Sequence, residues 1–552
     1  MKKAKRFIGV FLSALLVISL VTACGGGGNA NTPSSAPSSA PPTASTSTAP
    51  TSQPSQQPSP SAMPSYVPPP ETAEFVEDLV WVASDRIQTL DTTNPSTVSV
   101  GNLWQFWFFY DRLITYLPDG TFAPALATSW ESDDLQTYRF KLRDDVYFHN
   151  GEKFTADDVA FSIDRAKTAP GTHIYDRMGS IVESYDVIND YEIVIKLSNV
   201  NVDFIPFVSW VACGIVNRKA IEEDPENGHL IGTGKFIVTD FVPNEYVQYQ
   251  RNDNYWGDIP VTKTVTYRSI AEETARYTML ENNEAQIQWA VLPPFMDGLK
   301  SNPDLDYTSV VLNNFQYLGF NLLNPVLGDI NFRKAVAHTI VRDDCIIIAR
   351  DGWAAAPTPP ITWGYGTEFR NNDVYLPEHD INKAKEYLAQ SRYAGETFEI
   401  ITSNPISTLN AQVIQEQLSE IGVGISVREL DGPTFMTSTQ WGMSDYELIL
   451  TATEWQDYAS SARASFYPGV AGNRAQYDNP EVVALFDEAL TTLDAAKRES
   501  LYKKIQESIA EDIPALLVFH TEMIIGIRNG VDGMRLYPNN CHDFSGVYMV
   551  KQ

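Results

Sequence analysis

The sequence predicts an α/β protein of more than one lobe, in which helices cover a parallel sheet. The first observation is an alternation of segment types, in the order strand 398–402, helix 408–421, strand 424–430, a short helix opened by Gly432-Pro433, and strand 446–451. This β-α-β-α-β order favours parallel strands joined by right-handed crossovers. The second observation is length, because the roughly 480 residues after residue 70 exceed what one hydrophobic core usually supports.

Apolar spacing predicts the helices of this region. Within 408–421, Val413, Ile414 and Leu418 recur close to the 3.6-residue period, and Gly422 is expected to end the helix. Nearer the C-terminus, Asn479-Pro480 has the composition of an N-cap followed by the first helical residue. The apolar face of that helix is formed by Val482, Val483, Phe486, Ala489, Leu490 and Leu493. A further helix is expected to begin near Asp494 and must end before Pro514.

The N-terminus has the pattern of a secretory signal. Lys2, Lys3, Lys5 and Arg6 precede an apolar run over 7–20, which is too short for a membrane span of about 20 residues. The run ends in VTAC at 21–24, which resembles the lipobox of bacterial lipoproteins. The resemblance implies that residues 1–23 are removed and that Cys24 is lipidated. Ordinary signal cleavage, with Cys24 an incidental thiol, is the alternative.

Residues 24–70 are expected to form a disordered tether after the lipidated Cys24. No charged residue occurs from 25 to 70, and Pro, Ser, Thr, Ala, Gln and Gly fill nearly all positions. Such a segment cannot bury enough apolar surface to offset its chain entropy. Its reach lies between roughly 40 Å as a flexible coil and about 140 Å in a polyproline-like form. We therefore expect an extracytoplasmic domain anchored by lipid at the outer face of the plasma membrane, or in the periplasm.

Charge and cysteine content exclude several classes of protein. The formal net charge is −29, and removal of the four cations of the signal gives −29 − 4 = −33. Nucleic acids and anionic lipid headgroups are therefore not expected partners, because binding them requires basic patches. After Cys24, only Cys213, Cys345 and Cys541 remain. They form neither a disulfide framework nor a CxxC metal site, although one bridge with a thiol left over is possible.

The sequence contains little that is typical of an enzyme. HExxH, GxSxG, GxxxxGK[ST] and EF-hand spacings are absent, and the seven histidines lie far apart. We therefore expect no catalysis, no metal and no cofactor.

Three neighbouring segments carry a family resemblance. ATSWE at 127–131, LRDDVYFHNG at 142–151 and FTADDVAFSIDR at 154–165 resemble LAxSWE, LRxGVxFHDG and FTAxDVxFSxxR. These patterns belong to the extracytoplasmic solute-binding proteins, family 5, of bacterial ABC importers, the oligopeptide- and dipeptide-binding type. The chain departs from them at Asp145 and Asn150, which sit at turns and so concern the local backbone.

The resemblance continues along the chain. GTGKF at 232–236, RNDNYWG at 251–257, GFN at 319–321 and DINFRKAV at 329–336 are similar to GTGPY, RNPDYWG and GFN followed by DxRVRQAL. Asn331 replaces an expected arginine. Together the motifs span nearly everything after about residue 75. His149 belongs to one of the turn motifs, so we expect it to make structural hydrogen bonds.

The resemblance implies a two-lobed, periplasmic-binding-protein-like α/β fold of class II, the large peptide-binding type with an extra subdomain. Lobe I would comprise 76–322 and 525–552, with the subdomain at about 117–231. Lobe II would comprise 323–524. A hinge would join the lobes where the chain crosses near 322 and 524.

The candidate binding loop follows the strand 446–451 and reads EWQDY at 454–458. Loops at the carboxyl ends of such strands line ligand crevices, and interdomain pockets favour aromatic walls with few polar anchors. In peptide-binding members, an Asp in a DY context receives the α-ammonium of the ligand, and Asp457 matches it. Trp455 and Tyr458 flank this carboxylate as wall residues. The alternative is that Asp457 caps the next segment and Trp455 belongs to the core.

Three further aromatics are candidates for the cleft wall. Trp104 begins the aromatic-rich segment 104–110, Trp289 follows a strand-like stretch at 285–288, and Tyr317 precedes the expected hinge. Core packing is the open alternative for each of them.

The resemblance implies a substrate-binding lipoprotein of an ABC importer. It would capture an oligopeptide or dipeptide between its lobes, work as a monomer, and deliver the ligand to the permease and ATPase subunits. Oligosaccharide binding is an alternative, because the 11 Trp and 26 Tyr could stack on sugars. Scattered histidines disfavour nickel or a metal chelate. A peptide-sensing receptor is the alternative from another class.

Overall fold

The structure, a computed structural model, describes residues 73–98, 100–117, 120–357, 369–374, 376–454 and 459–551. The predicted signal peptide, Cys24 and the tether lie outside these residues, so those predictions stay untested. In the part of the chain that the structure describes, no helix combines the length and the apolar character needed to cross a membrane.

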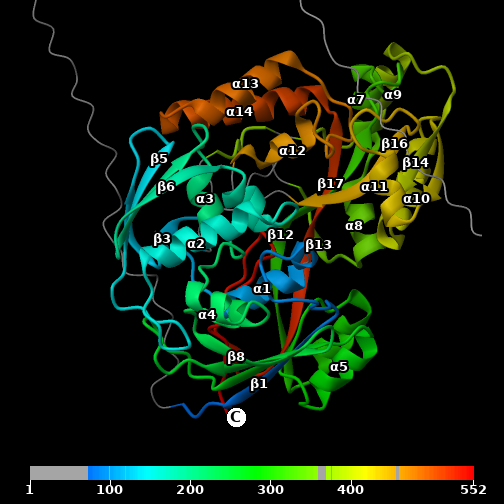
Figure 1. The fold of residues 1–552 in the computed structure, drawn as a ribbon. Coiled ribbons are helices and arrows are strands. Elements are labelled where there is room, and N and C mark those ends of the chain that lie inside the picture. The colour runs from blue at the N-terminus through cyan, green and yellow to red at the C-terminus, as the bar shows by residue number, and fades with distance from the viewer. Residues whose placement is uncertain are drawn as a thin grey trace, which may run out of the picture. The chain divides into compact units, whose positions relative to one another are not determined.

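A single large sheet organises the fold (Figure 1). In order across the sheet its strands are β15 (Gly424–Glu429), β14 (Thr397–Thr402), β16 (Leu448–Glu454), β12 (Leu305–Phe320), β17 (Ala515–Arg528), β11 (Ile287–Gln288), β1 (Asp78–Ala83), β10 (Thr264–Ser269), β9 (Tyr246–Arg251) and β8 (Phe236–Val242), and β13 (Ala354–Ala355) pairs with β17 beside this path. β14 runs parallel to both β15 and β16, which confirms the parallel sheet predicted from the sequence.

Fourteen α-helices are assigned in the described residues. Their bounds are α1 (Val100–Phe109), α2 (Ala156–Lys167), α3 (Phe204–Ser209), α4 (Arg218–Glu223), α5 (Glu273–Glu281), α6 (Met296–Ser301), α7 (Ile330–Thr339), α8 (Arg342–Arg350), α9 (Ile381–Gln390), α10 (Pro405–Ser419), α11 (Gly432–Ser438), α12 (Arg463–Phe466), α13 (Pro480–Thr491) and α14 (Ala495–Asp512). Smaller sheets are formed by β4 (Ala127–Glu131), β5 (Thr137–Leu142), β7 (Glu192–Leu197) and β6 (Val182–Asn189), by β2 (Ile114–Tyr116) with β3 (Phe122–Pro124), and by β18 (Val531–Asp532) with β19 (Tyr548–Met549).

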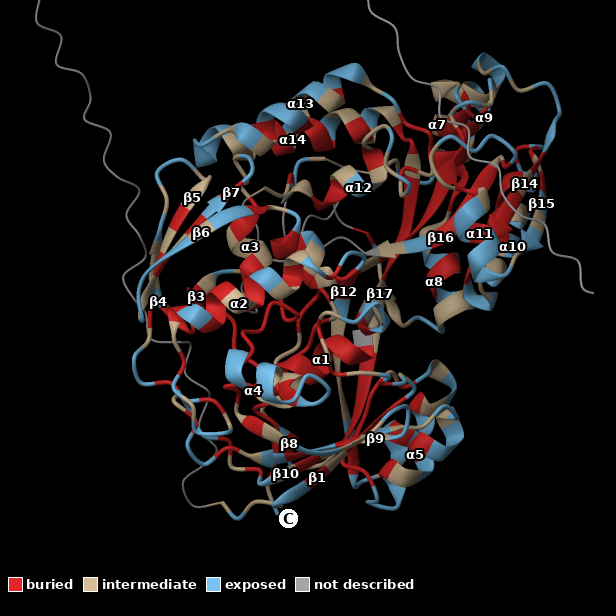
Figure 2. Ribbon diagram, in the orientation of Figure 1, coloured by how far each residue is buried: buried red, intermediate tan, exposed pale blue. Residues whose placement is uncertain are grey.

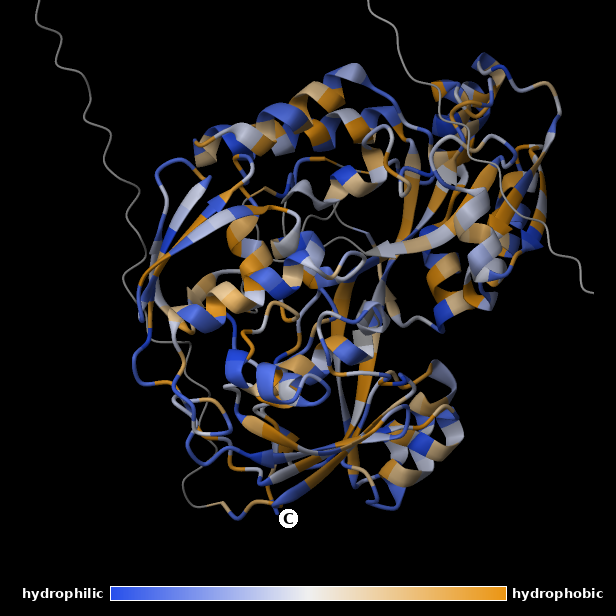
Figure 3. Cartoon of the chain, in the orientation of Figure 1, coloured by the Kyte–Doolittle hydropathy of each residue, from blue (hydrophilic) through white to orange (hydrophobic). Residues whose placement is uncertain are grey.

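The first half of β16, residues 448–451, is buried on both faces, whereas the edge strand β15 is mostly exposed or intermediate. Figure 2 shows buried residues in this part of the sheet. Leu448 and Leu450 of β16 join a core cluster with residues of α7, α8 and α10. Ile449, on the opposite face, joins a second cluster with α13 and α14. Since side chains alternate along a strand, one apolar run serves two helical layers. Figure 3 shows hydrophobic segments in this part of the sheet.

Local signals explain where the helices begin and end. α10 starts earlier than the predicted residue 408, because Asn404 caps it by accepting a hydrogen bond from Ser407 N at 2.9 Å, and Pro405 occupies the first turn. Gly422 follows the helix at φ +81°, a conformation that favours glycine. The predicted cap of α13 is confirmed, since Asn479 accepts the backbone N–H groups of Glu481 and Val482. The helix α14 begins where it was predicted, after Asp494, which accepts the N–H of Lys497.

The antiparallel pair β12 and β17 lies in the middle of the large sheet and connects its two halves, β15-β14-β16 and β11-β1-β10-β9-β8. Along 305–311 β12 pairs with β17, and along 314–320 it also pairs with β16. The β12–β17 register shifts between Val311 and Phe315 and again between Gln316 and Tyr317. The predicted hinge near 322 and 524 and the predicted lobe boundaries stay predictions, because strand pairing does not measure motion.

The other end of the sheet packs on an aromatic core. Trp81 of β1 lies 5.5 Å from Trp104 of α1 and 4.9 Å from Tyr267 of β10, between ring centroids. Phe108, one turn further along α1, stacks on Tyr249 of β9 at 4.6 Å. Large rings bury much apolar surface for the few dihedral angles that they fix, so this cluster anchors α1 to the sheet.

The motif FTADDV forms the start of α2. The Asp158 carboxylate accepts hydrogen bonds from Thr155 N at 3.0 Å and from Arg218 N at 3.1 Å. The first contact belongs to a capping box, and the second ties α2 to the start of α4. Burial raises the pKa of Asp158, while these donors lower it.

Replacement of Asp158 with Ala should reduce the free energy of unfolding by about 1–3 kcal/mol, because two backbone N–H groups lose their acceptor. Urea denaturation followed by circular dichroism measures the loss. Asp157→Ala is the matched control, since Asp157 lies in the same helical turn but is exposed. Equal losses in the two variants would contradict the assignment.

Candidate functional site

The predicted ligand-binding loop follows the end of β16. Trp455, Asp457 and Tyr458 lie outside the described residues, so their roles stay predictions. The residues on either side of the loop are described. Before it, the backbone of Glu454 pairs with Asn314 of β12, within the irregular part of the β12–β17 ladder. β16 therefore ends beside the middle of the long strand β12, next to its shifted register with β17.

After the loop, the Ser460 hydroxyl donates a hydrogen bond to the Asp203 carboxylate. Asp203 lies 257 positions earlier, directly before α3, in the part of the chain that contains the four-stranded sheet. The positive charge of Arg498, in α14, also acts on this carboxylate. The segment that follows the predicted loop is thus held against a distant part of the chain.

Asp203 is a residue that the sequence analysis missed. It is 5% exposed, and burial raises the pKa of its carboxyl to about 6, while the Ser460 hydrogen bond and the Arg498 charge lower it. A signal was present, because Asp203 is the one charged residue between Lys196 and Arg218. An acid isolated in an apolar stretch is a candidate for burial with a specific partner.

Tyr317 lies close to the base of the loop. It and Thr453, the penultimate residue of β16, line the same small cavity, together with Arg474. Burial raises the pKa of Tyr317 to about 12, so its hydroxyl remains protonated at neutral pH. Of the three wall aromatics predicted outside the loop, Tyr317 is the one that the structure places beside β16.

Trp104 and Trp289 contact each other, with ring centroids 4.4 Å apart. They are 1% and 2% exposed, respectively, and belong to a different core cluster from Tyr317. The Trp104 indole donates a hydrogen bond to the carbonyl oxygen of Asn540 at 2.7 Å. Both rings are packed as core residues in this structure, and ligand contact by either of them stays a prediction.

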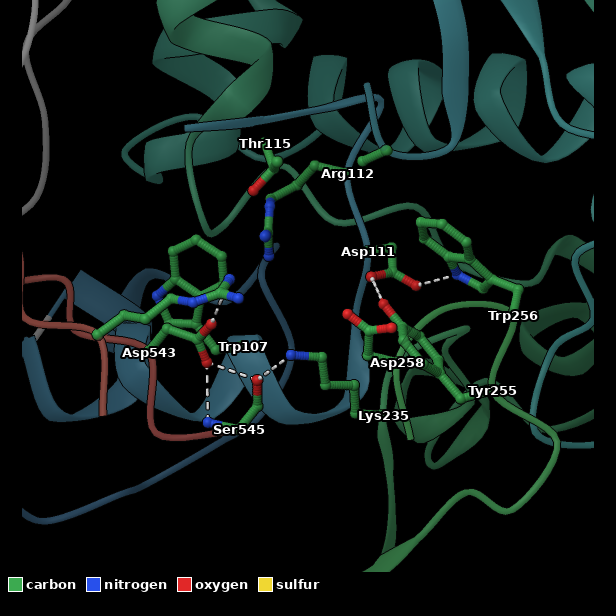
Figure 4. Close-up of a pocket in the computed structure, with 12 residues that line it drawn as sticks. Trp107, Asp111, Arg112, Thr115, Lys235, Tyr255, Trp256, Asp258, Asp543 and Ser545 are labelled. Carbon is green, nitrogen blue, oxygen red and sulfur yellow. Dashed lines mark hydrogen bonds and ion pairs between the residues drawn. The ribbon is translucent and has the colours of Figure 1, made fainter. Parts of the chain in front are cut away.

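The segments that carry the family resemblance meet around a buried carboxylate. Asp111 accepts hydrogen bonds from Thr233 Oγ1 at 2.9 Å, Tyr255 OH at 3.1 Å and Trp256 Nε1 at 2.9 Å. The last two contacts are drawn in Figure 4. Burial raises the pKa of Asp111, while Trp256, Arg112 and the remaining donors lower it. The GTGKF and RNDNYWG motifs therefore serve packing rather than the predicted loop.

His149 has the structural role expected of it. The Gly232 N–H lies 3.4 Å from its Nδ1, and Nε2 lies 3.0 Å from the Gly234 carbonyl oxygen, so the ring proton belongs on Nε2. Burial lowers the pKa of His149 to about 4, which keeps it neutral. A β-carbon at Gly232 would lie 1.8 Å from the Phe109 carbonyl oxygen, so this close approach requires glycine.

The three cysteines in the described residues, Cys213, Cys345 and Cys541, are buried free thiols. The bridge that their number allowed does not form in the structure. Burial raises the pKa of both Cys213 and Cys345 to about 12, which makes them unreactive.

Comparison with known proteins gives a consistent result. The family described as bacterial extracellular solute-binding proteins, family 5 Middle, matches residues 121–477. The dipeptide-binding protein of Escherichia coli strain K12 is 24% identical over 477 residues, which cover 79% of this chain and 88% of that protein. Heme-binding protein A of Haemophilus influenzae is 26% identical over 485 residues, covering 79% of this chain and 86% of that protein.

A solved structure shares the fold. The ABC transporter-associated periplasmic binding protein of Helicobacter pylori, in complex with the peptide STSA, superposes with a TM-score of 0.68 at 23% identity. The match covers 86% of this chain and 99% of that one. The predicted two-lobed, periplasmic-binding-protein-like α/β fold is confirmed.

The buried Asp203 predicts a pH dependence. Its folded-state pKa of about 6 lies above the ordinary value of 3.8, so its contribution to stability is full below about pH 3.8 and is lost as pH rises through about 6. The loss should reach up to about 3 kcal/mol. Asp203→Asn should therefore gain free energy of unfolding relative to wild type between pH 4 and pH 7, measured by urea denaturation.

The control for this experiment is Asp133→Asn, at an exposed position of the same region. Its stability should follow the wild-type pH dependence. A parallel curve for Asp203→Asn would show that this carboxyl does not titrate as described.

Proposed function

Because the chain belongs to the bacterial extracellular solute-binding proteins of family 5, we propose that it captures peptides between its two lobes and delivers them to an ABC importer. The ligand is an oligopeptide or a dipeptide, and the receiving partners are the permease and ATPase subunits. The protein performs no catalysis. Ligand closes the lobes because it makes better contacts with the closed state than with the open one.

The observation that supports this proposal is the position of the described residues on either side of 455–458. β16 brings the chain to the irregular part of the β12–β17 ladder, and Ser460 attaches the chain beyond the segment to Asp203. In α/β lobes ligands bind at the carboxyl ends of sheet strands, and Asp457 follows β16 in the sequence, so we propose that it contributes a carboxylate there. Relatives named as dipeptide- or di/tripeptide-binding support a peptide as the ligand.

The chemistry of recognition follows from Asp457. Its carboxylate forms a charge-assisted hydrogen bond with the α-ammonium of the peptide, which every unmodified peptide offers. Backbone hydrogen bonds supply the remaining affinity, and the ligand side chains lie in roomy, hydrated pockets. The protein therefore tolerates many peptide sequences.

We further propose that Cys24 carries the lipid anchor and that the segment 24–70 holds the globular part away from the membrane. This localisation places the protein where an importer receives its ligand. The globular part works as a monomer.

Native mass spectrometry of the protein purified without denaturation identifies the ligand. Masses that fragment into amino acids would support the proposal and give the peptide length. Masses spaced by hexose units would replace it with oligosaccharide binding.

For the peptide found in this way, Asp457→Asn should weaken binding by about 10–100-fold, since a charge-assisted hydrogen bond is replaced by a neutral one. Isothermal titration calorimetry measures the change. Asp445→Asn is the control, because Asp445 is exposed and precedes β16. Unchanged affinity in Asp457→Asn, with an unchanged thermal unfolding curve, would remove Asp457 from the site.

The lipid anchor has a separate test. Cys24→Ala should move the protein from the membrane fraction to the soluble fraction of the cell, because the thiol that accepts the lipid is gone. Immunoblotting after fractionation measures the distribution, and Cys541→Ala serves as a control at a buried thiol. Retention of Cys24→Ala in the membrane fraction would contradict the proposal.

A further inference from the structure

A polar cavity lies beside Asp111, and none of its lining residues belongs to the predicted ligand-binding set. Its volume is about 40 Å³, and α1, the segments that follow α1 and precede β8, and the C-terminal segment contribute to its wall. A buried water requires about 10–15 Å³ of such volume. The cavity therefore has room for about three waters or for one small ion.

The guanidinium of Arg112 is directed into this cavity. Figure 4 shows it between Asp111, Lys235 and Asp543. Arg112 is 4% exposed, and its carbon Cζ lies 3.9 Å from the centre of the Trp107 ring, which covers one face of the group. Its Nε and Nη1 atoms are buried and have no hydrogen-bond partner among the described residues.

Such an arrangement is costly unless something occupies the cavity. A buried charged donor without an acceptor loses its hydration and gains nothing in exchange. Burial lowers the pKa of Arg112, and it also lowers the pKa of Lys235, whose Nζ lies 3.3 Å from Ser545 Oγ. Two cationic groups thus approach the cavity with incomplete pairing.

The charged lining of the cavity is formally neutral. Arg112, Lys235 and Arg535 are cationic, and Asp111, Asp543 and Asp258 are anionic, which gives 3 − 3 = 0. Asp258 is exposed and the Arg535 side chain is 31% exposed, so water screens both of them, and the unpaired donors of Arg112 belong to the buried part of the wall.

The two buried carboxylates already have donors of their own. The hydroxyl and indole groups described above serve Asp111, and Asp543 accepts a hydrogen bond from Ser545 N at 2.8 Å. Arg535 Nη1 lies 3.8 Å from Asp543. Neither carboxylate is therefore available to pair fully with Arg112.

We propose that this cavity binds a small monovalent anion, either a halide or a carboxylate of one or two carbon atoms, held by the free donors of Arg112 and by Lys235. The anion supplies the missing acceptor for Nε and Nη1. The bound anion contacts the residues that directly follow α1, so occupancy of the cavity stabilises this part of the fold. The proposal is independent of the peptide-binding function.

Crystals of the intact protein grown in sodium bromide test the site directly. An anomalous difference peak within hydrogen-bond distance of Arg112 Nε or Nη1 is expected. A cavity that contains only water in these crystals would overturn the proposal.

Thermal unfolding in solution provides a second test, at constant ionic strength, with chloride, formate or acetate replacing the bulky anion gluconate. The small anions should raise the unfolding temperature along a saturating curve, because they bind the folded state. Arg112→Met should reduce the apparent anion affinity at least tenfold. Arg86→Met, at an exposed arginine, should leave it unchanged.

Lys235→Met should also weaken the dependence of the unfolding temperature on the small anion. This variant provides the test if Arg112→Met does not fold. The same anion dependence in wild type and in the folded cavity variant would overturn the proposal.

Discussion

The antiparallel pairing of β12 with β17 is the constraint on which the rest of the structure depends. It joins the strands around β16 to the strands around β1 in one hydrogen-bonded sheet. A continuous ladder resists bending because every backbone group is paired with a neighbour, whereas shifted registers leave some pairs unmade. The two shifts, between Val311 and Phe315 and between Gln316 and Tyr317, interrupt the ladder at the middle of the long strands.

The strand β16, which precedes the predicted binding loop in the sequence, ends at this same point. Glu454 pairs with β12 next to the shifted register, and the chain beyond the predicted loop contacts Asp203. The residues on either side of the loop therefore contact two segments, β12 and the chain before α3, that lie far apart in the sequence.

The residues that identify the family are not those that would select the ligand. The motif residues His149, Gly232 and Thr233 make contacts that hold the segments before β8 against the end of α1 and against Asp111, which follows it. Their chemistry is that of satisfied buried polar groups, which specify one packing arrangement. Such a scaffold can carry different ligands when the loops change, as the relatives named for dipeptide and heme binding illustrate.

The sequence by itself determined the local elements and the class of fold. Asn479, Asp494 and Gly422 act within one helical turn, and the apolar run of β16 indicates burial on both faces, so short-range patterns were sufficient.

Tertiary structure alone decided which distant residues meet. The Ser460–Asp203 contact spans 257 positions, and the register shift in β12 depends on strands far apart in the chain. It also separated Tyr317, beside β16, from Trp104 and Trp289, which pack against each other in the core. Sequence periodicity describes which face of an element is buried, but the partner on that face is set by the packing of the whole chain.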